Sequence, residues 1–590
     1  MKATRFPVRR GRLALVAALA ALAGQAALIS AAPEAANAAP GGSHGLFATG
    51  DLLVTTGVWK TNADITAGTT QLPPNCATAN PAYLTCGTAV APGTYPLVFN
   101  NDASDGSFGV TQPIVLDEVD PSTGRLVKAV TVPDNPANGN YLTTSFSSKS
   151  ELAVNQSTDG MYVTFVGYVA APGTIDASNA NTPGEIDPTI ADSATPTYRA
   201  VAQVNSEGQF GFTETNAFSG DNGRAALLDP EDGPKGTIFA AGNAGNGANP
   251  EPPAVIDGAG SQILTPADEP ESAQDPGTPT AYGNFNVTEL GDTADKSGKD
   301  DNYRGLTVYN GVVYLTKGSG SNGVDTVYFV DPNGTSTNSN GVGLPSTSAT
   351  LPSLSGWTAP TYSTSNTTLG LTAKNPGLTP TNTYILKGFP TAIAKGATDA
   401  SDYPFGLWFA NPTTLYVADE GAGDNTYDAS TNTYTAAASS TTAGLQKWSF
   451  NSSAGEWQLD YVLQNGLDLG TPYRVIPKRM GDRYPTGLNT TDSGTGLPWA
   501  PATGGLRNLT GRVNSDGTVS LWASTSTVSG SGDQGADPNK LVEITDDLGA
   551  TSASQVVHEK FNTVVQAIDG QVVRGVSFTP GTSLSKRQHH

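Results

Sequence analysis

The chain has 590 residues and a formal charge of −22, and only 14 % of its residues are charged. This acidic balance argues against a broad nucleic-acid-binding surface, because contacts to phosphates need a basic face. The simpler explanation of the charge is solubility of an exported protein. Abundant Gly, Thr, Ser and Asn between many short apolar runs predict an all-β chain with a packed core.

The first 38 residues have the pattern of a secretory signal. Five basic residues accompany an apolar stretch from Leu13 to Ala23, and Ala36-Asn37-Ala38 is a small-residue cleavage site. Arg9-Arg10 could instead belong to a twin-arginine signal, but the flanking residues favour ordinary secretion. Nothing later approaches the roughly 20 apolar residues of a membrane span. We predict a secreted or periplasmic protein without a membrane span.

Two cysteines, Cys76 and Cys86, are the only ones in the chain. In an exported protein we expect them to form one disulfide that closes a small loop. A two-cysteine metal site is disfavoured because no histidine lies near them in the sequence.

A short phrase, usually a basic residue leading into an apolar strand, recurs along the chain, and each copy is followed by a tight turn and a second apolar run. In one copy, Asn310-Gly311 is a two-residue hairpin turn between 304–308 and 312–316. Four antiparallel strands per unit, at intervals of roughly 70 to 100 residues, predict a β-propeller with long insertions. Clear copies lie at 222–228, 303–308, 506–511 and 573–578, and degenerate copies at 149–154 and 404–409.

The two ends of the chain are expected to close the propeller. The run Val573–Pro580 looks like a first strand with nothing after it, and 52–58, 114–119 and 126–132 supply three further strands. Pairing the last strand with the N-terminal blade would remove an exposed edge. This count predicts six blades, or seven if 44–48 forms a strand of its own. We expect one domain over 39–582, a tail at 583–590 and a monomer.

The repeated phrase places cations at equivalent points of the units. The first strand of each propeller blade lines the central channel, so these cations should encircle one end of it. Arginine suits an anion site because its planar fork binds carboxylate or phosphate bidentately. The alternative is that each cation pairs with carboxylate or carbonyl groups of a neighbouring blade. The predicted anion-binding residues are Lys149, Arg224, Arg304, Arg507 and Arg574.

Acidic, glycine-rich loops follow two of the predicted second strands, and we place them at the same end as the cations. Carboxylates and carbonyls in such turns are the ligands that calcium prefers, although neither loop has EF-hand spacing and ordinary turn chemistry is the alternative. The predicted metal ligands are Asp419, Glu420, Asp533 and Asp537. After the signal, the histidines are His44, His558, His589 and His590, which argues against histidine-ligated zinc and a Ser-His-Asp system.

Tryptophans divide into two groups in this interpretation. Trp59 and Trp499 fall in loops at the same end of the channel and could stack on a sugar. Trp408, Trp448, Trp457 and Trp522 lie within strand patterns and are expected in the core.

The secretion signal, Arg-Gly-Leu-Thr-Val at 304–308, Val-Ala-Asp-Glu-Gly at 417–421 and Leu-Arg-Asn-Leu-Thr-Gly at 506–511 together resemble the bacterial secreted propellers grouped as phytase-like or esterase-like. The resemblance could extend over residues 45–582. It implies a calcium-supported propeller whose channel mouth binds phosphate or ester substrates through lysines, arginines and carboxylate-bound calcium. No complete catalytic set matches residue by residue, so the catalytic residues stay unassigned.

Three functions are compatible with these features. The first, which we expect, is a secreted calcium-supported hydrolase of a phosphoester or carboxylic ester, in which metal and arginine hold the substrate and a metal-bound water attacks. The second is a noncatalytic extracellular binding protein for an anionic or glycan ligand. The third is a lactonase-like metal-dependent hydrolase. Fold analogy contributes much to this ranking, and a fold alone does not fix a function.

Overall fold

The computed structural model describes residues 45–583 with gaps, the longer of which are 75–85, 97–108, 246–251, 268–300, 352–360, 364–376 and 392–401. The expected signal, His44, Cys76, Asp533 and the tail beyond Ser583 lie outside the described residues. The disulfide between Cys76 and Cys86 therefore stays a prediction. Among the described residues, no helix has the length and hydrophobicity that a membrane crossing would need.

Strands dominate the described chain, as predicted. Helical structure with defined bounds is limited to α2 (Thr435–Ser439) and the 3-10 turns Pro136–Asn138, Asn338–Gly341 and Ala553–Gln555. Two small ribbons pair β15 (Thr361–Ser363) with β16 (Gly377–Thr379), and β20 (Tyr427–Asp428) with β21 (Thr433–Tyr434).

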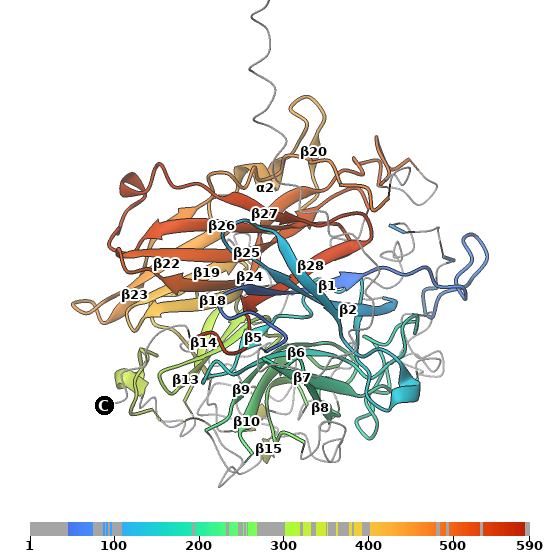
Figure 1. Cartoon of the computed structure of the whole chain (residues 1–590), viewed down its shortest axis with the longest axis horizontal. Coiled ribbons are helices and arrows are strands. Elements are labelled where there is room, and N and C mark those ends of the chain that lie inside the picture. The colour runs from blue at the N-terminus through green and yellow to red at the C-terminus, as the bar shows by residue number, and fades with distance from the viewer. Residues whose placement is uncertain are drawn as a thin grey trace, which may run out of the picture.

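Four sheets have four or more described strands, and a fifth has three (Figure 1). The largest has nine strands: β1 (Leu52–Val58), β2 (Thr111–Val119), β3 (Leu126–Thr131), β4 (Thr143–Ser145), β5 (Asn155–Gln156), β6 (Tyr162–Tyr168), β7 (Arg199–Asn205), β8 (Phe210–Thr215) and β28 (Gln571–Phe578). The three-stranded sheet has β9 (Gly223–Asp229), β10 (Thr237–Gly242) and β11 (Gly260–Leu264). The first four-stranded sheet has β12 (Leu306–Tyr309), β13 (Val312–Lys317), β14 (Thr326–Val330) and β17 (Thr383–Ile385). The second has β18 (Pro404–Asn411), β19 (Thr414–Asp419), β22 (Gly444–Asn451) and β23 (Glu456–Leu463). The third has β24 (Ala502–Val513), β25 (Thr518–Val528), β26 (Lys540–Asp547) and β27 (Asn562–Gln566).

The predicted number of six blades, or seven, is wrong: four sheets have four or more described strands, which indicates four blades. The short strand β4 pairs with both β2 and β6, so the first two repeats share one nine-stranded sheet. The repeat that begins at Arg224 has three described strands, and part of its expected range lies outside the described residues. Residues 45–48 form no strand, which removes the expected basis for a seventh blade.

The predicted closure of the chain is confirmed. Strand β28 pairs antiparallel with β1, with Leu52 opposite Phe578 and Gly57 opposite Val572. Figure 1 shows the red C-terminal strand beside the blue N-terminal strands. The pairing removes two sheet edges at once, one from each end of the chain.

The innermost strands of the repeats contact one another in a closed ring. The order around the ring is β5, β9, β12, β18, β24 and β28, and β28 returns to β5. The sheets are therefore arranged as in a β-propeller, around a central channel. Each of these strands contains, overlaps or directly follows one of the repeated phrases, so the repeat marks the channel-lining strand.

Glycines allow neighbouring inner strands to approach closely. A Cβ atom at Gly305 would lie 2.1 Å from the Phe405 carbonyl oxygen, and one at Gly575 would lie 2.3 Å from the Leu152 carbonyl oxygen. Real Cβ atoms are not found so near a backbone atom, so these positions need glycine for space. This requirement explains why glycine follows the cation in the copies at 304 and 574.

Hydroxyl groups on the second strands join adjacent repeats. Thr316 Oγ1 accepts the Gly305 N–H at 2.8 Å and donates to the Phe405 carbonyl of the next repeat. Thr55 Oγ1 likewise accepts the Gly575 N–H at 2.8 Å and donates to the Leu152 carbonyl at 2.7 Å. One side chain thus satisfies a buried donor of its own repeat and a buried acceptor of its neighbour, which fixes the ring of inner strands.

Candidate functional site

The repeated cations lie within the inner strands or a few residues before them. Arg224, Arg507 and Arg574 are within β9, β24 and β28, Arg304 comes two residues before β12, and Lys149 precedes β5. Four of the five lie close enough for the positive charge of one to lower the pKa of another. Arg304 and Arg507 act on Lys149, and Arg304 acts on Arg224. We call Lys149, Arg224, Arg304 and Arg507 the cationic mouth.

Glu420 is the carboxylate at the centre of this cluster. Its Oε1 lies 3.2 Å from Lys149 Nζ, and its Oε2 lies 3.1 Å from Arg507 Nε. Burial alone would raise the pKa of Glu420, but Lys149, Arg507 and Arg304 outweigh burial and hold the pKa below its ordinary value. The Glu420 side chain is therefore ionised and serves as the counter-ion of three cations.

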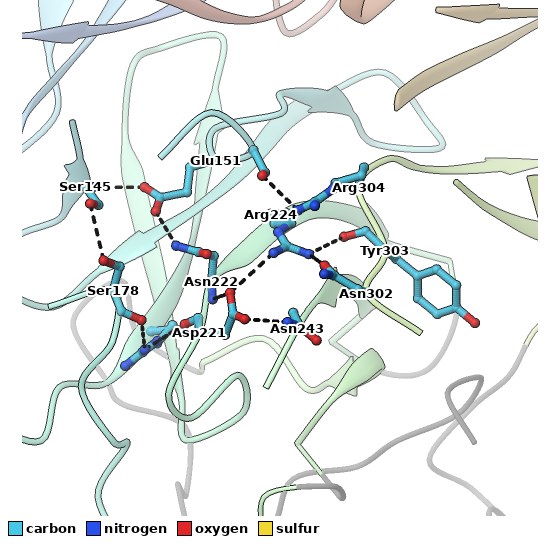
Figure 2. Close-up of polar contacts among 12 residues, drawn as sticks. Ser145, Glu151, Ser178, Asp221, Asn222, Arg224, Asn243, Asn302, Tyr303 and Arg304 are labelled. Carbon is cyan, nitrogen blue, oxygen red and sulfur yellow. Dashed lines mark hydrogen bonds and ion pairs between the residues drawn. The ribbon is translucent and has the colours of Figure 1, made fainter. Parts of the chain in front are cut away.

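Arg304 and Arg224 occupy the adjacent part of the mouth, which Figure 2 shows. Arg304 Nη1 donates to Ser150 Oγ at 2.9 Å. Arg224 donates to the Tyr303 carbonyl at 3.1 Å and to the Asn302 side chain, and pairs with Asp221 at 3.3 Å. Asp221 also accepts from Asn243 on its other side. A hydroxyl group therefore holds the Arg304 guanidinium, and a backbone carbonyl, an amide and a carboxylate hold that of Arg224.

Ion pairs join the cations of the mouth to carboxylates. Lys149 and Arg507 pair with Glu420, and Arg224 pairs with Asp221. The nearby Lys317 and Asp325 form a further buried pair at 2.7 Å, and Glu151 also acts electrostatically on Arg224. Burial is the largest effect on the pKa of Lys149 and lowers it, and the charges of Arg507 and Arg304 lower it further. The negative charge of Glu420 acts in the opposite direction and raises this pKa. Four cations gathered on so acidic a protein can attract anions to this end of the channel.

The side chains of the mouth and its carboxylates differ in how far they are exposed to solvent. The side chain of Lys149 is 32 % exposed and that of Asp221 is 20 % exposed, whereas Glu420 and Arg507 are almost fully buried. A hollow of about 220 Å³ lies next to the segment that follows Glu420 and is lined by Tyr403, Gly421–Gly423, Gly504 and hydroxyl groups around α2. Because Lys149 is more exposed than Arg224 or Arg507, a ligand arriving from solvent would meet Lys149 before these arginines.

Arg574 differs from the other repeated cations. Its guanidinium donates to the carbonyls of Phe146 and Gly535, the latter at 2.6 Å. These are backbone groups of other repeats, so the contacts match the packing alternative and not the anion site.

The predicted calcium ligands do not converge. Asp419 is buried and accepts the N–H groups of Tyr403 at 2.7 Å and Gly421 at 2.9 Å, while Glu420 faces cations. Asp537 accepts the Tyr484 hydroxyl at 2.8 Å in a separate buried setting. Within the described residues, no group of three His, Cys, Asp or Glu could hold a metal ion. Asp533 lies outside these residues, so calcium stays a prediction.

Two of these carboxyl groups have raised pKa values for the same reason. Burial raises the pKa of Asp419 to about 7 and that of Asp537 to about 6, and hydrogen bonds to each carboxylate offset only part of this effect. Both side chains are inaccessible from the channel mouth because their residues are fully buried. A group in this position can affect stability, but it cannot reach a ligand in the mouth.

The tryptophan predictions are partly corrected. Trp499 is buried against Val475 and Tyr484, so its ring has no face open to a sugar. Trp59 is half-buried and packs against Tyr95 and Phe146, with ring centroids 5.9 and 5.7 Å away. Trp448, Trp457 and Trp522 are in the core as expected, whereas Trp408 is half-buried.

Sequence reasoning missed three charged residues that lie beside the cationic mouth. Asp221 stands three residues before Arg224, a spacing that could have suggested a local pair. Lys317 and Asp325 flank the loop after the second strand and pair across it. Only the three-dimensional arrangement of the repeats shows that these residues adjoin the cations.

Comparisons with known proteins do not identify a family. No family model matches the chain, and no curated protein matches its sequence. A solved structure of a polysaccharide lyase, a PL25 ulvan lyase bound to a sulfated glucuronic acid–rhamnose glycan, is similar over 79 % of this chain and 91 % of its own. The identity is 9 % and the TM-score 0.27, so we draw no functional argument from it. The phytase-like or esterase-like assignment stays a prediction.

Proposed function

We propose that this protein is an extracellular binding protein that captures an anionic group of its ligand at the cationic mouth. The observation that carries the proposal is the gathering of four cations at one end of the ring of inner strands, with one ammonium, that of Lys149, reaching solvent. Lys149 has one defined acceptor, Glu420 Oε1, and an ammonium group has three donors. It can therefore bind a carboxylate, sulfate or phosphate oxygen while it keeps Glu420.

The surroundings of Lys149 support a preorganised site. Arg304 and Arg507 are buried and held by hydrogen bonds, so little side-chain freedom would be lost on binding. Arg224 Nε is buried and has no hydrogen-bond partner in the part of the chain that the structure describes. An incoming anion would therefore be attracted to cations whose positions are already fixed.

Binding is better supported than hydrolysis by the same geometry. Ester hydrolysis without a metal would need a general base within reach of the ligand. Among the described carboxyl groups of the predicted site, those with raised pKa values, Asp419 and Asp537, are fully buried. The calcium-supported phosphoester or carboxylic ester hydrolase and the lactonase-like hydrolase stay as predictions that an activity assay separates from binding.

Calorimetric titration with inorganic sulfate, glucuronate and phytate tests the proposal. We expect at least one of these anions to bind at low salt and the affinity to fall about tenfold or more in Lys149→Ala, because a charged hydrogen bond contributes about 1.5–3 kcal/mol. The matched control is Lys387→Ala, which removes an exposed lysine away from the mouth. Equal loss in both variants, or no binding of any anion, would refute the proposed site.

A turnover assay completes the test. Phosphate esters, acyl esters and small lactones are incubated with the protein in calcium and then in chelator. Binding without turnover in either condition is the expected result. Turnover that disappears with chelator would instead establish the calcium-supported hydrolase.

A further inference from the structure

A second cavity, of about 440 Å³, lies at the other end of the central channel. Its lining comes from the inner strands of the ring, with residues such as Leu227, Thr307, Thr510 and Ser577. Each of these positions follows a mouth or channel cation, Arg224, Arg304, Arg507 or Arg574, by three residues along the chain. Because a strand advances about 3.3 Å per residue, the two ends are about 10 Å apart along the channel.

The chemistry of this cavity is opposite to that of the cationic mouth. Two half-buried aromatic residues, Tyr309 and Trp408, contribute to its wall beside aliphatic side chains, and Asp159 and Glu231 are the charged residues of the lining. None of the described residues in the lining is Lys, Arg or His. The nearby Arg512 places its guanidinium over the rings of Trp522 and Phe578, at 5.8 and 5.7 Å.

We infer that this cavity is a binding site for a small organic cation with an apolar body, such as a quaternary ammonium compound. A cation is attracted to the faces of tryptophan and tyrosine rings and to carboxylates, while its methyl groups bury apolar surface. Carboxylates without a basic residue in the lining favour a positive ligand over a neutral or negative one. The volume is within the range of ordinary small-ligand pockets.

The site is independent of the function proposed for the mouth. It uses different residues of the same strands, and its ligand has the opposite charge. A single channel would thus present an anion site at one end and a cation site at the other. Failure of one site leaves the other unaffected, which allows each to be tested separately.

Choline and 3,3-dimethylbutan-1-ol are the probes of choice because they have nearly the same shape and differ by one positive charge. Isothermal titration of the full chain should show choline binding about tenfold more tightly than the uncharged alcohol. Equal affinities would show an apolar cavity without cation recognition and would overturn the inference. No detectable binding of choline at millimolar concentrations would overturn it as well.

Two variants locate the site. Trp408→Leu should weaken choline binding about tenfold and reduce the preference over the alcohol. If that variant does not fold, Asp159→Asn gives the second test: it keeps an acceptor for Ser157 and the Met161 N–H, both hydrogen-bonded to Asp159, but removes the negative charge. We expect a threefold or greater loss of choline affinity in Asp159→Asn and no change in Lys149→Ala. Choline binding that Lys149→Ala abolishes, or that both cavity variants leave intact, would place the ligand elsewhere.

Discussion

Glu420 and Arg507 form an ion pair between two repeats: Glu420 Oε2 lies 3.1 Å from Arg507 Nε. Glu420 follows β19, whereas Arg507 lies in β24, the inner strand of the next sheet around the ring. The other oxygen of the same carboxylate lies 3.2 Å from Lys149 Nζ. One side chain therefore ties three repeats together at the channel end and sets the charge balance of the cationic mouth.

Replacing this carboxylate should destabilise the fold. In Glu420→Gln, the cations Lys149, Arg304 and Arg507 lose their shared counter-ion, and breaking a buried ion pair in this way typically costs about 3–5 kcal/mol. We expect the midpoint of urea unfolding to fall accordingly and sulfate to restore part of the loss. The control is Glu207→Gln in an exposed turn, which should leave the midpoint unchanged. A Glu420→Gln variant as stable as the wild type would contradict this role.

The buried Asp117 should make stability depend on pH. Its Oδ2 accepts the Thr56 hydroxyl at 2.7 Å, and burial raises its pKa from 3.8 to about 6 despite this hydrogen bond. The folded state therefore holds the proton more tightly than the unfolded state between these pH values. Stability from this group is present at low pH and is lost as the pH rises toward 6 and above.

The corresponding experiment compares Asp117→Asn with the wild type by urea unfolding at pH 4 and pH 7. The variant lacks this titration, so its free energy of unfolding should improve relative to the wild type by up to about 3 kcal/mol between the two pH values. Asp419 and Asp537 titrate in both proteins and cancel in the difference. Parallel pH profiles of the two proteins would rule out a raised pKa at Asp117.

The hydroxyl bridge between repeats is tested by Thr316→Val, which keeps the shape of the side chain. The change removes the acceptor for the Gly305 N–H and the donor to the Phe405 carbonyl, and leaves both groups buried. Losing partners for such groups costs about 1–3 kcal/mol each, which a fall in the unfolding midpoint would report. Thr431→Val, at an exposed position, should be nearly neutral. Equal effects of the two changes would argue against the bridge.

The close approach of inner strands predicts a strict requirement for glycine at 575. A Cβ atom there would lie 2.3 Å from the Leu152 oxygen and 2.5 Å from the Val154 nitrogen, both of them backbone atoms. Gly575→Ala should therefore destabilise the protein by about 1–3 kcal/mol through overpacking. Gly57→Ala is the control, because a Cβ atom there meets nothing nearer than 3.6 Å. If both variants unfold at the wild-type midpoint, the spacing of the ring is looser than we describe.

Local signals in the sequence predicted the inner strands and the turns well. Asn310 and Gly311 have positive φ values of 45° and 72°, as a two-residue hairpin turn requires, and they join β12 to β13. The cation in or just before most of the inner strands was visible as a repeat, and a strand at the C-terminus without partners pointed to closure with β1. These features depend on residues close together in the chain.

Features that depend on contacts between repeats were not predictable in the same way. Glu420 was expected to hold calcium, but Lys149 and Arg507, 271 and 87 residues away, surround it instead. The strand β4 has three residues, too short for a recognisable pattern, yet it joins two repeats in one sheet. The far cavity gathers side chains from separate strands, none of which is unusual alone.

The most direct test of anion binding at the cationic mouth is to locate a bound anion. Crystals grown without sulfate and soaked in selenate, at a concentration near the Kd for sulfate, would give an anomalous signal from selenium. We predict a selenate ion within hydrogen-bond distance of Lys149 Nζ, and none there in crystals of Lys149→Ala. Selenate bound only elsewhere, or equally in both crystals, would contradict the central claim.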